Sequence, residues 1–234
     1  LSPRTPGTTL QMACGTSLQA AMLLAGRIAS GQIDSAIAAG SDTTSDVPLV
    51  FQKRFARRMV KLSQARDLMG RLRAFKGFSF GELSPQAPGN AEPRTRLSMG
   101  QHCELMARRW GISRAEQDQL ALESHQKAAA AYADGFFDQL VVPYQGVARD
   151  NNVRADSSLD KLAALKPAFD RSAAGTLTAG NSTPLTDGAS AVFLTSEEYA
   201  AKHGLKVQAW LTHARTSAVN FVSGEGLLMA PTLA

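Results

Sequence analysis

The chain has 234 residues, of which 44% are hydrophobic and 19% charged, and its net charge is +5. This composition argues against intrinsic disorder and leaves room for one large core or two modest ones. No run approaches the roughly 18 apolar residues of a membrane-spanning helix, and residues 1–9 lack a signal-peptide pattern, so we expect a soluble intracellular protein.

The two cysteines, Cys14 and Cys103, are too few for a disulfide framework or a four-ligand zinc site. We therefore predict reduced thiols, as in a cytosol or an organellar matrix, and no metal. The chain starts with Leu1 and stops at GLLMAPTLA without an obvious terminal element, so we expect it to be a fragment.

A strand, a helix and a second strand are predicted near the start of the chain. Residues 8–13 (TTLQMA) form a short strand that leads to Cys14, and residues 16–30 form a helix. Apolar residues surround most of this helix, so we expect it to be buried. Residues 35–39 (SAIAA) form the second strand, with a turn at 40–42. This spacing predicts a parallel crossover unit in an α/β layered fold.

Residues 53–76 carry nine lysines and arginines against the single acidic residue Asp67, so the rest of the chain is mildly acidic. A polyanionic partner fits such a segment: cofactor phosphates, a nucleic acid or an acidic protein. A solvated helix face is the plainer reading. Aromatic residues interleave with the charges, which is compatible with base stacking or with burial at a membrane surface: Phe51, Phe55, Phe75, Phe78 and Phe80.

The middle of the chain contains two helices with strong boundary signals. Residues 47–96 are predicted to be loop-like or peripheral, with a segment rich in proline and glycine towards their end. Residues 98–110 form a helix closed by Gly111. The sequence at 113–116 is a capping box that opens a long helix to about Asp134.

The last third of the chain alternates short elements. A short helix is predicted at 159–165, and the glycine-rich stretch 175–188 follows it. A buried strand at 189–194, a helix at 196–203 and a further strand at 206–214 complete the pattern.

Cys14 lies at a junction between a predicted strand and a helix, with Gly15 beside it. Free backbone N–H groups and the helix dipole favour an anion there, so the thiol could act as a nucleophile. The alternative is a cysteine that packs as a small hydrophobic residue among alanine and methionine. Spacing alone does not choose between these two roles.

Four blocks, in this order, resemble segments of the thiolase family. They are QMACGTSLQAA with the following GRIASGQIDSAIAAGSDTTSD, LSMGQHCELMARRWGISRAEQDQLALESHQKA, DNNVRADSSLDKLAALKPAFD and GTLTAGNSTPLTDGASAVFL. Together they cover nearly the whole chain. The segments SMG, NSTPLTDGAS and LLMAPT are most similar to those of the degradative 3-ketoacyl-CoA thiolases of the trifunctional-enzyme β-subunit type.

The resemblance implies a thiolase-like layered αβαβα fold of the α/β class, present as an incomplete fragment. The fragment would comprise the end of the N-terminal half, the loop domain and the start of the C-terminal half. The corresponding boundaries are 1–43 and 185–204 for the N-terminal core, 44–184 for the loop domain that covers coenzyme A, and 205–234 for the truncated C-terminal core.

The resemblance also implies roles for single residues. Cys14 would accept the acyl group, and Arg154 would lie near the adenine and phosphate end of coenzyme A. A guanidinium group suits phosphate oxygens, although a plain surface arginine is the alternative. Contacts with the pantetheine and the acyl group would come from Ser98, Met99, Ser182 and Thr183.

Some residues depart from the family pattern or carry structural roles. Ser98 replaces a histidine that many thiolases have, and His102-Cys103-Glu104 replaces Thr-Ala-Glu, which leaves chain-length preference open. We predict that Cys103 packs and that Asn181 and Asp187 hold the glycine-rich turn. His102, like His125, is expected at the surface or the edge of the core, and neither matches the family's catalytic histidine motif.

The implied activity is thiolytic cleavage of 3-ketoacyl-CoA in fatty-acid β-oxidation, through an acyl-enzyme on Cys14. Coenzyme A and acyl-CoA would be substrates, with no permanently bound cofactor. The family's catalytic histidine and second cysteine fall outside the sequence, so the fragment is expected to be inactive alone. The alternatives are acetyl-CoA condensation and a non-catalytic acyl-CoA or lipid carrier.

The resemblance further implies a homodimer or tetramer, with an α subunit of a fatty-acid oxidation complex as an additional partner. The basic segment 53–76 is then expected to dock that subunit or a membrane face, peripherally, and not a nucleic acid. The compartment would be the bacterial cytoplasm or the mitochondrial matrix.

Overall fold

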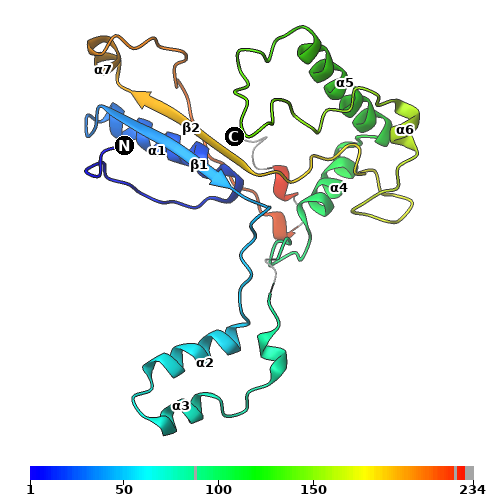
Figure 1. The fold of residues 1–234 in the computed structure, drawn as a ribbon. Coiled ribbons are helices and arrows are strands. Elements are labelled where there is room, and N and C mark those ends of the chain that lie inside the picture. The colour runs from blue at the N-terminus through cyan, green and yellow to red at the C-terminus, as the bar shows by residue number, and fades with distance from the viewer. Residues whose placement is uncertain (87–88, 224–225, 230–234) are drawn as a thin grey trace. The chain divides into compact units, whose positions relative to one another are not determined.

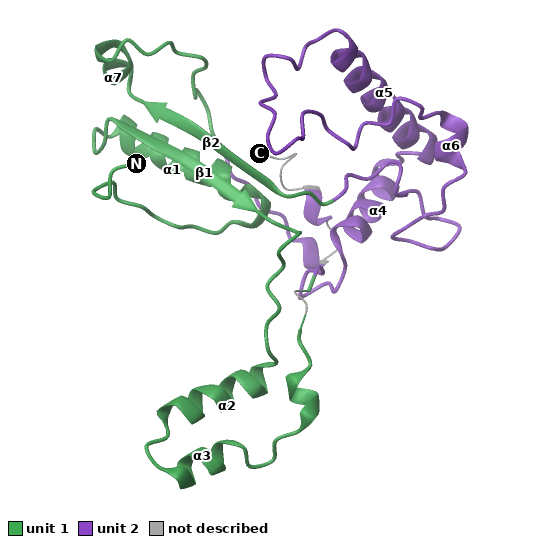
Figure 2. Cartoon of the chain, viewed as in Figure 1, with its two compact units in different colours: residues 1–89, 185–214 green, residues 90–184, 215–234 purple. Residues whose placement is uncertain are grey.

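A computed structural model describes residues 1–86, 89–223 and 226–229 of the chain. The chain forms two compact units, shown in different colours in Figure 2. Unit 1 comprises Leu1–Gly89 and Leu185–Ala214, and unit 2 comprises Asn90–Pro184 and Arg215–Ala234.

Unit 1 contains a two-stranded antiparallel sheet with a helix against one face (Figure 1). Strand β1 (Ser35–Asp42) pairs with β2 (Gly188–Thr195) from Ser35 opposite Thr195 to Asp42 opposite Gly188. Helix α1 (Thr16–Ala29) contacts both strands, and α7 (Glu197–Lys202) follows β2. Both strands and both helices were predicted, but residues 40–42 continue β1 instead of forming a turn.

Two predicted strands are wrong. Residues 8–13 and 206–214 have no strand conformation, and the parallel crossover unit is therefore absent from the described part of the chain. A strand exists only through hydrogen bonds to a neighbouring strand, and neither segment finds such a neighbour among the described residues.

The predicted burial of α1 and β2 is also wrong for this chain taken alone. None of the residues of α1 is buried, and Leu18 is 68% exposed. On the sheet, Ile37 and its cross-strand partner Phe193 are 44% and 52% exposed. The reason is that α1 covers one face of the two strands, and no described element covers the other.

Helix α1 approaches β1 closely at Gly40. A Cβ atom at this position would lie 2.1 Å from the Ser17 hydroxyl, so only glycine fits here without a rearrangement. Since Ser17 belongs to the first turn of α1, this contact fixes the start of the helix against the end of the strand.

Residues 47–86, predicted as loop-like, contain a helical hairpin. Its helices are α2 (Lys53–Gln64) and α3 (Leu68–Ala74), and the short 3₁₀ turn η2 (Phe80–Leu83) follows. Edge-to-face and tilted contacts between phenylalanine rings supply its apolar contacts, with ring centroids 5.0 to 6.2 Å apart: Phe51, Phe55, Phe75, Phe78 and Phe80.

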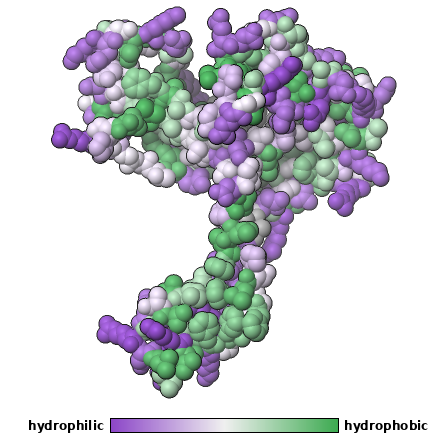
Figure 3. Space-filling model, viewed as in Figure 1, coloured by the Kyte–Doolittle hydropathy of each residue, from purple (hydrophilic) through white to green (hydrophobic). Residues whose placement is uncertain are grey.

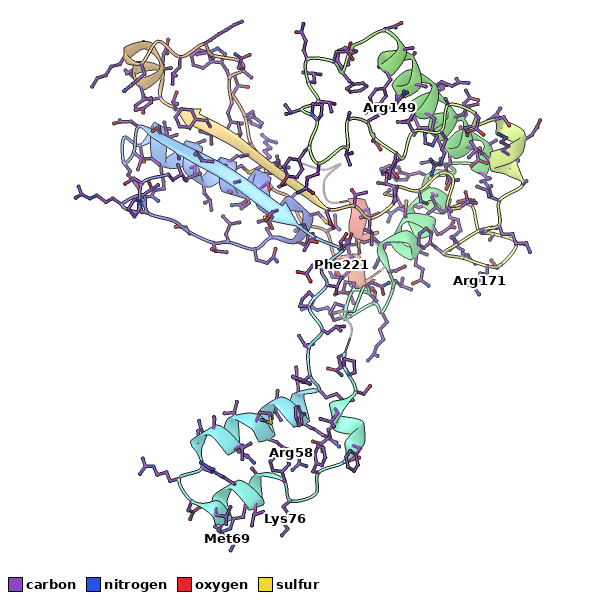
Figure 4. The ribbon with its side chains drawn as sticks, in the orientation of Figure 1. Arg58, Met69, Lys76, Arg149, Arg171 and Phe221 are labelled. Atoms are coloured by element: carbon purple, nitrogen blue, oxygen red, sulfur yellow. The ribbon has the colours of Figure 1, made fainter. Side chains whose placement is uncertain are left out.

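Arg58 holds this hairpin together. Its Nε donates to Glu82 Oε2 at 2.7 Å, and its other nitrogens donate to the carbonyl oxygens of Ala74, Lys76 and Gly77. Figure 4 shows the Arg58 side chain among the elements of the hairpin. Arg58 Nη2 also donates to Glu82 Oε1, at 3.1 Å, so the pair is bidentate. These hydrogen bonds from Arg58 keep the pKa of Glu82 below its usual value.

Unit 2 is built on α4 (Met99–Trp110), α5 (Arg114–Ala133) and the short α6 (Leu159–Ala163). The short 3₁₀ turns η3 (Phe221–Ser223) and η4 (Leu227–Met229) come later in the chain. The predicted helix boundaries of α4 and α5 are confirmed. Both helices start with a complete capping box, and Gly111 ends α4 in the left-handed conformation (φ 67°).

Candidate active site

Cys14 is exposed and lies in a single 3₁₀ turn, η1 (Ala13–Gly15), directly before α1. The amide of Gly15 donates to Met12 O at 2.9 Å. The Thr16 hydroxyl accepts from the Met12 amide at 2.9 Å and lies 2.7 Å from Ala13 O. Thr16 therefore ties both sides of the turn that presents the Cys14 thiol.

The backbone of this turn is strained at the residue before the cysteine. Ala13 has a φ of 44°, in a region that residues with a Cβ seldom adopt. Such conformations persist only where the surrounding bonds hold them, and they cluster at functional sites. Here the hydrogen bonds of Thr16 provide the hold.

The start of α1 is open to an anion. It has no side-chain cap and no acidic residue in its first turn. The first backbone N–H groups of a helix lack intrahelical partners, and the helix dipole is positive at this end. The arrangement is compatible with a nucleophilic role of Cys14, whose side chain is exposed in this chain and not buried.

The other five predicted site residues, Ser98, Met99, Arg154, Ser182 and Thr183, all lie in unit 2, whereas Cys14 belongs to unit 1. Ser98 caps α4: its hydroxyl accepts from the Gln101 amide at 3.3 Å. Met99 is 43% exposed. Ser182 is half-buried, while Arg154 and Thr183 are exposed.

The glycine-rich stretch that carries Ser182 and Thr183 is fixed to α4 by a buried carboxylate. Glu104 is 1% exposed, and its Oε1 accepts from the amides of Thr176 and Leu177 at 3.0 and 2.9 Å. Its Oε2 accepts from the Thr176 hydroxyl at 2.9 Å. These three donors compensate the burial of the carboxylate without a basic partner.

A second buried carboxylate fixes the same stretch to α5. Asp118 is 3% exposed and accepts from Arg114 Nε at 2.7 Å and from Asn181 Nδ2 at 2.9 Å. Asn181 in turn accepts from the Thr178 amide at 2.7 Å. Asn181 thus holds the turn, as predicted, and determines where Ser182 leaves it.

Asp187 pins the end of the glycine-rich stretch within unit 1. Its Oδ1 accepts from the amides of Ser45 and Thr44 at 3.0 and 2.7 Å and from the Thr43 hydroxyl at 3.1 Å. The hydrogen bonds of Ser45, then those of Thr44 and Thr43, hold the pKa of Asp187 far below its usual range. The predicted role in fixing the turn is confirmed.

His102 is buried, at 1% exposure, and not at the surface or core edge as predicted. Its Nε2 lies 2.9 Å from the Thr95 hydroxyl, whereas its Nδ1 is buried without a hydrogen-bond partner among the described residues. Cys103 is half-buried, and burial together with Glu104 raises the pKa of its thiol. A thiol kept protonated suits the predicted packing role.

No group of three metal-binding side chains is found in residues 1–86, 89–223 and 226–229. Among the helices that the structure describes, none combines the length and the apolar character needed to cross a membrane.

A comparison with protein-family models shows which family the chain belongs to. A family model described as "Thiolase, N-terminal domain" matches residues 1–198. The chain belongs to the thiolase family. A 3-ketoacyl-CoA thiolase of Yersinia enterocolitica is 40% identical over an alignment of 240 positions, which covers all of this chain and 54% of that protein. The chain therefore spans about half the length of the curated relatives it matches.

Solved structures agree with the family assignment. A thiolase from Ascaris suum, in complex with coenzyme A, matches 90% of this chain and 50% of its own, with a TM-score of 0.70 and 25% identity. An acetyl-CoA acetyltransferase from Syntrophomonas wolfei matches 82% of this chain and 45% of its own, with a TM-score of 0.65 and 28% identity. The predicted thiolase-like fold class is confirmed.

Sequence reasoning missed the buried polar residues that support the site. The pair Arg114–Asp118 has the helical spacing of four residues, which could have indicated it. Glu104 and its partners are 72 and 73 residues apart, and Arg58 and Glu82 are 24 apart. No local pattern signals contacts over such separations.

Proposed function

We propose that this chain supplies the nucleophile and the coenzyme-A-binding residues of an acyltransferase that cleaves 3-ketoacyl-CoA. The observation that carries the proposal is the exposed Cys14 in a strained turn at an uncapped helix start, within the region that matches the thiolase family. Coenzyme A is a substrate of the reaction and not a resident cofactor.

The proposed reaction has two steps. The Cys14 thiolate attacks the 3-keto carbon, a C–S bond forms, and the bond between C2 and C3 of the substrate breaks. Its electron pair remains on the enolate of acetyl-CoA, which then takes up a proton. A second coenzyme A thiolate next attacks the thioester carbon, releases the Cys14 thiolate and leaves as the shortened acyl-CoA.

Residues outside this chain would supply the proton transfers, following the family pattern of a histidine and a second cysteine. In this proposal the chain is inactive alone. Its parts would be the N-terminal core at 1–43 and 185–204, the loop domain at 44–184 and the start of the C-terminal core at 205–234. Residues 224–225 and 230–234 of that last part lie outside the described residues.

Coenzyme A would be held by unit 2 in this proposal. Arg154 is exposed and available for the phosphates, and Ser182 and Thr183 follow the pinned Asn181. Ser98 would contact the pantetheine while it caps α4, and the exposed Met99 would contact the acyl group. The complex of the Ascaris suum thiolase with coenzyme A supports this ligand class.

We predict that Cys14→Ala lowers kcat for thiolysis by roughly a thousandfold or more in the active enzyme that contains this chain, because no acyl-enzyme forms. The Cys103→Ala variant is the matched control and should keep kcat near that of the wild type. Steady-state thiolysis assays with acetoacetyl-CoA measure the kcat of both variants. A Cys14→Ala enzyme with wild-type turnover would refute the proposal.

The condensing direction is the second candidate, because the Syntrophomonas wolfei relative is an acetyl-CoA acetyltransferase. Steady-state assays that compare acetoacetyl-CoA with a long-chain 3-ketoacyl-CoA distinguish it from the degradative reaction in β-oxidation. A non-catalytic acyl-CoA carrier would bind both compounds without turnover.

The helical hairpin at 47–86 is proposed as a peripheral docking surface for an α subunit or a membrane face of a fatty-acid oxidation complex. Basic and apolar side chains are exposed together on it, and Figure 3 shows hydrophobic residues on this part of the chain. Leu68 and Leu72 are 73% and 61% exposed, and Phe80 is 83% exposed. This composition is typical of helices that bind anionic surfaces.

The docking test must leave Arg58 intact, because Arg58 holds the hairpin together. We predict that neutralising the exposed Arg57 and Lys61 to glutamine weakens complex assembly at low salt, and that the difference from the wild type shrinks at high salt, where these charges are screened. Sedimentation with the α subunit and flotation with anionic vesicles measure the two partners separately. Unchanged assembly and unchanged flotation would contradict docking.

The same proposal places the protein, as a homodimer or tetramer, in a bacterial cytoplasm or a mitochondrial matrix.

A further inference from the structure

The loop that carries Arg154 is fastened to one face of α5. Its two anchors on the helix are His125 and Tyr132, which are seven residues apart and therefore lie two turns from each other on the same face. His125 Nδ1 accepts from the Arg154 amide at 3.2 Å, and the Tyr132 hydroxyl accepts from the Asp150 amide at 3.0 Å.

A third contact closes the loop over the helix. The Arg149 guanidinium lies 4.3 Å from the centre of the Tyr132 ring, at the distance of a cation–π interaction. Within the loop, the Asn152 amide donates to Asp150 Oδ1 at 2.7 Å. The loop is therefore held at both ends and has a defined shape.

The Arg154 side chain keeps donors for a ligand. Its Nη1 donates to Asn151 O at 2.9 Å, which fixes the direction of the guanidinium. Its Nε and Nη2 have no hydrogen-bond partner within the described residues, and the side chain is exposed. A guanidinium oriented in this way is suited to phosphate oxygens.

We infer that His125 is the positioning residue for the phosphate-binding end of the coenzyme A site. It holds the Arg154 backbone through Nδ1, and its proton is on Nε2. His125 acts on the nucleotide part of coenzyme A through Arg154 and does not touch the reacting atoms. The inference rests on the proposed function, which assigns Arg154 to that part of the substrate.

The test compares two substitutions of His125 in the active enzyme. His125→Leu removes the acceptor, whereas His125→Asn places an amide oxygen near the position of Nδ1. We expect His125→Leu to raise the KM for coenzyme A roughly three- to tenfold, the effect of one lost hydrogen bond, with kcat unchanged. His125→Asn should restore most of the affinity. Gln126→Leu, at an exposed neighbouring position of α5, is the matched control.

A shortened substrate separates positioning from general damage. Pantetheine lacks the nucleotide of coenzyme A and its phosphates. With pantetheine as the acceptor, His125→Leu should therefore behave as the wild type. An equal loss with pantetheine, a fall in kcat, or an unchanged KM for coenzyme A would each overturn the inference.

Arg154→Ala distinguishes this failure from a failure of the proposed function. If Arg154→Ala raises the KM for coenzyme A and His125→Leu does not, only the positioning role is wrong. If Arg154→Ala also leaves the KM unchanged, the assignment of Arg154 to the coenzyme A phosphates is wrong, and the positioning role falls with it.

Discussion

At the residue scale, Asp187 shows how one carboxylate joins two parts of unit 1 that are distant in sequence. It lies directly before β2 and accepts hydrogen bonds from Thr43, Thr44 and Ser45, which follow β1. These bonds favour the charged form, so the pKa of Asp187 is lower in the folded protein than in the unfolded chain. The link therefore depends on pH.

A group with a depressed pKa stabilises the fold above its unfolded pKa, near 4, and this contribution is lost as the pH falls below that value. We predict that Asp187→Asn lowers the melting temperature at neutral pH. The difference from the wild type should shrink as the pH falls from about 4 towards 2, because Asp187 takes up a proton in the unfolded chain over this range while the folded carboxylate stays charged. Thermal melts over this range measure it, and a difference that stays constant with pH would contradict the account.

Single-residue roles were predictable where a motif or a turn signal fixed them. Asn181 and Asp187 belong to this group, whereas the role of Cys14 is a proposal. The burial of His102 was not predictable, because it depends on the Thr95 hydroxyl, which reaches the ring only after the turn before α4 has formed. The internal role of Arg58 was missed for a similar reason: the sequence shows its charge but not the Glu82 carboxylate and the carbonyl groups that use it.

At the element scale, helix ends were predicted well because their signals are local. In the capping boxes of α4 and α5, Ser98 and Ser113 form hydrogen bonds with the residue three positions later in the sequence. Strands depend on distant partners instead: β1 and β2 are about 150 residues apart, and nothing local in 8–13 or 206–214 shows whether a partner exists. Residues 47–86 were predicted as loop-like or peripheral, with a solvated helix face as one reading of 53–76, but no local signal indicated that α2 and α3 pair as a hairpin.

The joint between α4 and the glycine-rich stretch gives a prediction at this scale. Glu104→Ala should lower the free energy of unfolding by about 1–3 kcal/mol, because the amides of Thr176 and Leu177 lose their acceptor. Denaturant titration followed by circular dichroism measures the change. Glu123→Ala, which removes a surface ion pair with Lys127 and a hydrogen bond from the Gln119 side chain, is the control and should leave stability nearly unchanged. An equal free energy of unfolding for Glu104→Ala and Glu123→Ala would contradict the stabilising role of Glu104.

At the scale of the whole molecule, the chain divides the proposed chemistry between its two units. Unit 1 presents Cys14, and unit 2 carries the residues proposed to hold coenzyme A. Family membership followed from the order of four sequence blocks, and the resemblance implied a core made of 1–43 and 185–204. In the structure, the pairing of β1 with β2 joins these two parts of the chain within unit 1, which comprises 1–89 and 185–214.

The central claim is that Cys14, and not Cys103, accepts the acyl group. The direct measurement is peptide mass mapping of the active enzyme after brief reaction with acetyl-CoA and acid quenching. The account predicts one acetyl group on the peptide that contains Cys14, none on the peptide that contains Cys103, and loss of the label when coenzyme A is added before the quench. An acetyl group on Cys103, or an unlabelled Cys14 in an enzyme that turns over, would contradict it.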